Sequence, residues 1–173
     1  LQKKNLIANE GKLIDASFVE VPIQRNSREE NKQIKEGETP DQWKENPNKL
    51  EQNDVNARWT KKNDKSYYGY KDHIKADEKS KLIDTYTVTD ASVHDSQEAE
   101  SLLTEEDKGQ PLHADSAYSG EAIETVVKEN EMENHIHEKG YGNHPLTEQQ
   151  KENNHIKSKT RARVEHIFGF IEN

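Results

Sequence analysis

The stretch Lys12-Leu-Ile-Asp-Ala-Ser-Phe-Val19 decides the fold class, because it has the composition of a buried β-strand. It is short, apolar and rich in β-branched and aromatic residues. Asp15 interrupts the run, and an ionised carboxylate in an apolar strand is costly unless a positive charge meets it. A lone Asp in a strand is most often only a satisfied polar residue, so the position by itself leaves a functional role open.

Outward from this strand, the sequence pattern predicts an α/β sheet. The predicted strands are 12–19, 66–76, 81–90, 111–115 and 132–137. Helices are predicted to begin at Asp95, Ser119 and Thr147, each of which can cap a helix. Hairpin strands followed by alternating helices and strands are typical of a sheet with helices on its faces.

A polar stretch, roughly residues 24–57, separates the first strand from the second. Gly37, Pro40 and Pro47 interrupt it, and large apolar residues are few. We interpret it as an insertion or long loop, with a helical turn near Ser27–Ile34. A loop of this length inside a compact domain is uncommon and usually functional.

The composition bounds the classes of protein to which the chain can belong. Its 173 residues suffice for one domain, but only 29% are hydrophobic and 34% are charged. Part of the chain must therefore be solvated loop or pack against material that this sequence does not contain. There is no cysteine, so disulfides and thiolate metal sites are excluded. No membrane span and no signal peptide is visible, and we expect a cytoplasmic protein.

The net charge of -9 disfavours nucleic acid as a partner, since a duplex repels an acidic surface. The charge is uneven, however. Residues 157–163 carry four positive charges and no negative ones, and Lys61, Lys62 and Lys65 form a second basic cluster. A local site for nucleic acid therefore remains possible.

Two further acids occupy positions that favour chemistry. Asp115 follows a short strand at its carboxyl end, where open α/β sheets place binding sites. Glu165 lies beside the apolar stripe Val164, Ile167, Phe168 and Ile171 of the last helix. Converging carboxylates would hold hard divalent cations such as Mg²⁺. The ordinary alternatives are that Asp115 caps a turn and that Glu165 is a surface acid paired with Arg161, four residues earlier.

Six stretches follow one another along nearly the whole chain: Ile14-Asp-Ala-Ser-Phe-Val19, Ala57-Arg-Trp-Thr-Lys-Lys62, Tyr68-Gly-Tyr-Lys-Asp-His73, Val88-Thr-Asp-Ala-Ser-Val-His-Asp-Ser96, Ala114-Asp-Ser-Ala-Tyr118 and Arg161-Ala-Arg-Val-Glu-His-Ile-Phe-Gly169. Together and in this order, they resemble bacterial insertion-sequence transposases of the DDE class, especially the group named after insertion sequence five.

The resemblance implies a ribonuclease H-like mixed sheet flanked by helices, with the polar insertion after the first strand. It implies that Asp15, Asp115 and Glu165 are the catalytic acids and the ligands of two Mg²⁺ ions, for which Mn²⁺ can substitute. The implied reaction is hydrolysis of phosphodiesters at the element ends, followed by strand transfer to target DNA. The implied DNA-binding residues are Arg161, Lys159, Arg163, Lys61 and Lys62.

The resemblance also implies partners: terminal inverted repeats, target DNA and further copies of the chain in the active complex. We expect one catalytic domain over residues 1–173, shortened at both ends. Two positions depart from the signature of the related superfamily. Ser158 stands where that signature has a Tyr, three residues before Arg161. Glu172 stands where it has a Lys that would contact DNA, seven residues after Glu165. Two other functions stay open: a catalytically inactive remnant that binds DNA or protein, and a ribonuclease H-like nuclease without transposition.

Overall fold

The computed structural model describes residues 6–171, which divide into two compact units. The core unit consists of the described residues up to Ser17, Asp72–Val88 and the chain from His94 onward. The insertion unit consists of Phe18–Lys71 and Thr89–Val93. The expectation of a single domain stays a prediction, and each unit is described by itself below.

The fold is α/β, as the sequence predicts. The strands are β1 (Lys12–Glu20), β2 (Arg58–Lys62), β3 (Lys65–Asp77), β4 (Ile83–Asp90), β5 (Pro111–His113) and β6 (Glu133–Asn134). The α-helices are α1 (Arg28–Lys35), α2 (Asp41–Lys44), α3 (Pro47–Gln52), α4 (Ala99–Leu102), α5 (Glu121–Glu129) and α6 (Glu148–Ile171). Short 3₁₀ helices are η2 (Asp95–Glu98), η3 (Glu105–Asp107) and η4 (Ser116–Tyr118).

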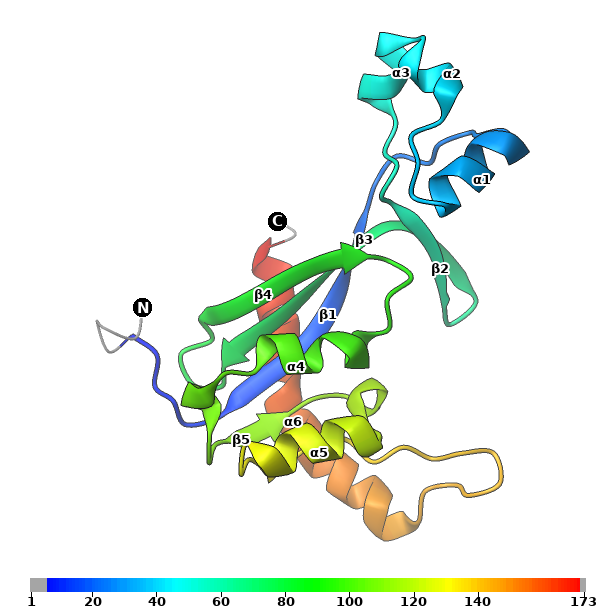
Figure 1. Ribbon diagram of the computed structural model, residues 1–173. Helices are drawn as coiled ribbons and strands as arrows, with labels where there is room; N and C mark the ends of the chain where they lie inside the picture. Colours follow the sequence, from blue (N-terminus) through cyan, green and yellow to red (C-terminus); the bar gives the residue numbers. More distant parts are fainter. Residues whose placement is uncertain (1–5, 172–173) are drawn as a thin grey trace. The chain divides into compact units, whose positions relative to one another are not determined.

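The strands form a mixed sheet in the order β2-β3-β1-β5-β6, with β4 paired to β3 (Figure 1). β1 and β5 are parallel neighbours, and so are β5 and β6, whereas β2 and β3 are antiparallel. Helices flank the sheet, which is consistent with a ribonuclease H-like transposase fold. Strand β2 is not among the strands predicted from the sequence pattern.

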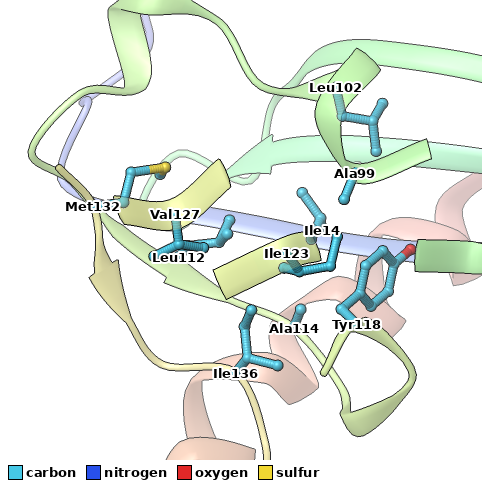
Figure 2. Packing of buried hydrophobic residues seen from close by; sticks show 10 residues of the cluster. All are labelled: Ile14, Ala99, Leu102, Leu112, Ala114, Tyr118, Ile123, Val127, Met132 and Ile136. Carbon is cyan, nitrogen blue, oxygen red and sulfur yellow. The ribbon is translucent and has the colours of Figure 1, made fainter. Parts of the chain in front are cut away.

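Alternation along β1 supplies both hydrophobic clusters of the core unit. Ile14 points into a cluster with residues of β5, α4 and α5, all shown in Figure 2. The adjacent Leu13 points into the opposite cluster, where Val164 and Ile167 of α6 cover the sheet. The apolar stripe predicted for the last helix is therefore largely confirmed, although Ile171 at its end is exposed.

Charged side chains complete the core. Lys12 and Lys75 are buried, and Lys12 Nζ lies 2.7 Å from Asp84 Oδ2 while Lys75 Nζ lies 2.6 Å from Asp107 Oδ2. Lys12 Nζ also lies 3.4 Å from Asp107 Oδ1, and Lys75 Nζ also lies 3.2 Å from Asp84 Oδ1. The four charges thus neutralise one another in the interior, which helps a chain of low hydrophobic content to form a core.

The insertion unit has more regular structure than a long loop. Helix α1 is capped by Ser27, whose side chain accepts from Glu30 N while Glu30 accepts from Ser27 N, which confirms the helical turn predicted there. Helices α2 and α3 were not predicted. Trp43 is fully buried and donates from Nε1 to Glu30 Oε1 at 2.8 Å, so it anchors these short helices.

Two predicted helix starts are wrong by one residue each. His94, rather than Asp95, caps η2, because its side chain accepts from Ser96 N. Gly120, rather than Ser119, precedes α5. The Thr147 cap of α6 is confirmed, since Thr147 Oγ1 accepts from Gln150 N at 3.3 Å. Within residues 6–171, no helix is long and apolar enough to cross a membrane.

Candidate active site

The register of two parallel strands relates Asp15 to Asp115. Lys12 of β1 pairs with Leu112 of β5, and Leu13 pairs with His113, so paired residues differ by 100 positions. Carried two positions further, the same register brings Asp115 level with Asp15. Neighbouring residues of parallel strands point to the same side of the sheet. The two predicted acids therefore lie side by side, Asp15 within β1 and Asp115 two residues beyond the end of β5.

Each Asp is oriented by a backbone N–H. Asp15 Oδ1 accepts from Ala16 N at 2.9 Å, and Asp115 Oδ1 accepts from Ala117 N at 2.7 Å. The second bond makes Asp115 the N-cap of η4. Capping and a role in the site are therefore compatible, because the cap uses one oxygen and fixes the carboxylate.

Arg161 of α6 contacts both Asp15 of β1 and Glu165 of its own helix. Its Nη1 donates to Asp15 Oδ2 at 2.8 Å, and its Nη2 lies 3.4 Å from Glu165 Oε1. The Asp15 side chain is 13% exposed, whereas that of Glu165 is 67% exposed. The predicted i, i+4 pair of Arg161 and Glu165 is thus present, but the shorter bond ties the helix to β1.

The Tyr118 hydroxyl lies within electrostatic reach of four acidic side chains. The Tyr118 side chain is fully buried in the cluster of Figure 2, and its hydroxyl oxygen has no hydrogen-bond partner among residues 6–171. Burial raises the pKa of Tyr118 well above its usual value, and the charges of Asp15, Asp95, Asp115 and Glu98 raise it further. These four acids therefore share one neighbourhood.

His137 connects Asp115 to the basic helix. Burial lowers its pKa, the positive charge of Arg161 lowers it further, and the Asp115 carboxylate partly offsets the effect. Ser158 Oγ lies 3.4 Å from His137 Nε2. A neutral imidazole thus lies within electrostatic reach of both Asp115 and Arg161.

The donors at this site have the chemistry that hard divalent cations favour, because they are carboxylate oxygens. The concentration of negative charge around the unpartnered Tyr118 hydroxyl also fits a cation as counter-charge. Across the described part of the chain, however, no three His, Asp or Glu side chains are arranged as a set of metal ligands. The residues fit a metal by type and neighbourhood.

The predicted DNA-binding residues fall into two groups. On α6, Lys159 is exposed, while Arg163 donates to Glu78 Oε1 at 2.9 Å. Lys61 and Lys62 belong to the insertion unit. There Lys61 pairs with Asp64 at 2.9 Å, and Lys62 lies 5.8 Å from the Phe18 ring centre. The substituted position Glu172 lies outside the described residues.

No role for Tyr118, His137 or Glu98 is predicted from the sequence. Tyr118 belongs to the family-like stretch Ala114–Tyr118, and Asp95 belongs to the stretch Val88–Ser96. A signal therefore existed for both. It did not reveal that the Tyr118 hydroxyl would be buried beside acids, since that depends on the contact between η2 and η4.

The mixed α/β sheet agrees with the family comparison. The family model described as "Transposase DDE domain" matches residues 9–173, and the chain belongs to this family. It is similar to the transposase for insertion sequence element IS1106 of Neisseria meningitidis serogroup B, with 35% identity over 118 residues. The match covers 68% of this chain and 41% of that relative, and no solved structure matches the chain. The finer assignment to the group of insertion sequence five stays a prediction.

Proposed function

We propose that this chain is the catalytic core of a DNA transposase that cleaves phosphodiesters at the ends of an insertion sequence and joins the freed strands to target DNA. The observation that carries the proposal is the junction of Asp15, Arg161 and Glu165 beside Asp115. Such a junction brings acids and a phosphate-binding guanidinium together in a chain of the DDE family.

In this proposal Asp15, Asp115 and Glu165 hold two Mg²⁺ ions, or Mn²⁺ in their place. When bound, the ions supply an activated water and stabilise the leaving oxygen. The backbone bonds to Ala16 and Ala117 keep two of the carboxylates in fixed orientations. Arg161 holds Asp15 close to Glu165 and offers its planar fork to a phosphate.

DNA contacts follow from the positive side chains near these acids. Lys159 is exposed on the same helix as Arg161, and Arg163 lies two residues beyond it. We assign phosphate contacts to these residues and to Lys61 and Lys62. The partners are the terminal inverted repeats and target DNA, with more than one copy of the chain in the active complex, and the place of action is the cytoplasm.

The decisive experiment uses a supercoiled plasmid that carries the DNA on both sides of the coding sequence. The protein should nick it only when Mg²⁺ or Mn²⁺ is present. Asp115→Asn should abolish nicking, because the variant keeps the η4 cap but loses the charge. Lys151→Ala, at the opposite end of α6, is the matched control and should nick normally.

The products separate the alternatives. Joined target strands indicate a transposase, whereas simple cleavage indicates a ribonuclease H-like nuclease. Unaltered plasmid with any metal, together with binding of the same DNA, indicates an inactive remnant. Mn²⁺ stabilisation in a thermal melt, lost in Asp15→Ala, tests the metal ligands without any DNA substrate.

A further inference from the structure

The insertion unit contains a cavity of about 630 Å³, which is the size of a small-molecule site. Three cations line it, Arg25, Lys35 and Arg58, and no acidic side chain does. Among the ion pairs of residues 6–171, none includes these three cations. In a chain with a net charge of -9, a cavity whose charged lining residues are all cations favours an anionic ligand.

Arg58 is fixed in place without being neutralised by a hydrogen-bonded acid. Its Nη1 donates to the carbonyl oxygens of Val55 at 2.7 Å and Ala57 at 3.1 Å, and its Nη2 donates to Ile34 O at 3.1 Å. Backbone carbonyls therefore hold the guanidinium in place. Asp54 lies within electrostatic reach of Arg58, but its oxygens accept from Asn56 N, Ala57 N and Tyr70 rather than from the guanidinium. Such preorganised charge is what phosphate recognition needs.

An aromatic wall adjoins these cations. Trp59 lines the cavity and is 52% exposed, and it pairs across the β2–β3 hairpin with Tyr68. The two ring centres are 5.1 Å apart, and Tyr68 is buried, which restrains the exposed indole. An exposed aromatic face beside positive charge is the usual platform for a nucleobase.

A third kind of group lies in the same cavity. The Asn26 side-chain oxygen is buried, and it has no hydrogen-bond partner within the described residues. A carboxamide of this kind can hydrogen-bond the edge of a base. Cations, an aromatic face and an amide together match the phosphate, the base face and the base edge of a nucleotide, and so fit a nucleotide better than a phosphate alone.

We propose that this cavity binds one nucleotide with an unpaired base, which stacks on Trp59 while its phosphate contacts Lys35 and Arg25. The ligand is either a free nucleotide or one unit of a single strand. The inference extends the DNA binding of the proposed function, but it requires neither the acids nor a metal. It can therefore fail while the cleavage chemistry holds, and the reverse is also true.

Tryptophan fluorescence tests the proposal directly, because the chain has two tryptophans and Trp43 is fully buried. A 12-nucleotide deoxyadenosine strand is titrated in EDTA, which excludes metal-dependent cleavage. It should quench the exposed Trp59, whereas the same strand annealed to its complement should leave the Trp59 emission nearly unchanged, even where the duplex binds elsewhere on the chain. Deoxyadenosine monophosphate should compete if a free nucleotide suffices, and inorganic phosphate should not.

Two lysines of α1 provide a matched pair of variants. Lys35 lines the cavity, whereas Lys32, three residues earlier and also exposed, does not. Lys35→Ala should weaken the strand about tenfold and Lys32→Ala less than twofold, by fluorescence anisotropy of a labelled strand. Trp59→Ala should weaken it about tenfold, with the Trp43 emission confirming an intact fold. Equal binding of the strand by all variants, or quenching of Trp59 by the duplex as strong as that by the single strand, would overturn the proposal.

Discussion

Asp15 Oδ2 accepts a hydrogen bond from Arg161 Nη1 at 2.8 Å, although the two residues lie 146 positions apart in the chain. The bond joins the first strand of the sheet to the last helix. Because Arg161 also reaches Glu165 at 3.4 Å, one guanidinium relates two acids that the sequence separates widely. The position of the Asp15 carboxylate therefore depends on α6 as much as on β1.

The first prediction concerns Arg161 and DNA. Arg161→Ala should weaken binding of duplex DNA and reduce the salt dependence of the binding constant by about one phosphate contact, because one cation is lost. Fluorescence anisotropy at several salt concentrations measures this slope. Lys151→Ala is the control on the same helix. An unchanged slope for the Arg161 variant would make Arg161 a purely structural ion-pair residue.

The second prediction compares the two strand acids without metal. Asp115→Asn should raise the melting temperature slightly, since it keeps the cap on Ala117 and removes one charge from the acidic group around Tyr118. Asp15→Asn should lower the free energy of unfolding by about 1–3 kcal/mol, because it weakens a largely buried bond to Arg161. Differential scanning calorimetry in EDTA gives both values.

The opposite signs matter for this second test. If both substitutions stabilise the protein, mutual repulsion outweighs the Arg161 bond at Asp15. If both destabilise it, the acidic charges around Tyr118 do not repel one another appreciably. Either result would contradict the electrostatic picture of the site.

Sequence pattern was sufficient for much of the fold because alternation and capping are local. The apolar run containing Asp15 forms β1, and Val164 and Ile167 of the predicted stripe are buried under the sheet. Ser27 with Glu30 forms the capping box of α1. Each of these features depends on residues that lie within a few positions of one another along the chain.

Long-range pairing could not be predicted in the same way. Lys12 and Lys75 look like surface residues in the sequence, yet both are buried because Asp84 and Asp107 meet them in space. Tyr118 became a candidate only through its buried hydroxyl and acidic surroundings. The DDE positions themselves came from family likeness, since no local pattern selects Asp115 or Glu165 over other acids.

The third prediction uses the buried acid of the insertion unit. Glu30 accepts from Lys49 Nζ, Ser27 N and Trp43 Nε1, and the Lys49 bond contributes most to lowering its pKa from 4.5 to about 2. A lowered carboxyl pKa gives stability that is present above pH 4.5 and is lost as the pH falls towards 2. Glu30→Gln should reduce stability at pH 7 and flatten this acid dependence.

Trp43 fluorescence during urea unfolding, between pH 2 and pH 7, follows the insertion unit. Glu29→Gln is the matched control, because Glu29 is the exposed neighbour on the same helix turn. A Glu30→Gln variant with the same acid dependence as the parent chain would show that the carboxylate is not held in its charged form by these bonds.

The fourth prediction concerns the Tyr118 hydroxyl. A buried hydroxyl without a hydrogen-bond partner costs free energy, so Tyr118→Phe should leave the stability unchanged or raise it by about 1 kcal/mol. Thermal unfolding in EDTA measures the change. A loss of about 1 kcal/mol or more would mean that the hydroxyl makes a hydrogen bond that stabilises the folded chain.

The last prediction concerns Gly69 of β3, whose backbone has φ +147°. A Cβ at this position would overlap the carbonyl oxygen of Val19, and backbone atoms cannot swing aside as a flexible side chain can. Gly69→Ala should therefore cost about 3 kcal/mol, from strained φ and from separation of β1 and β3. Gly37→Ala provides the control, because Gly37 has φ +83° with no atom near its Cβ position, and it should cost only about 1 kcal/mol. Equal costs in urea unfolding followed by Trp43 would show that the close approach of Val19 is not what requires glycine at position 69.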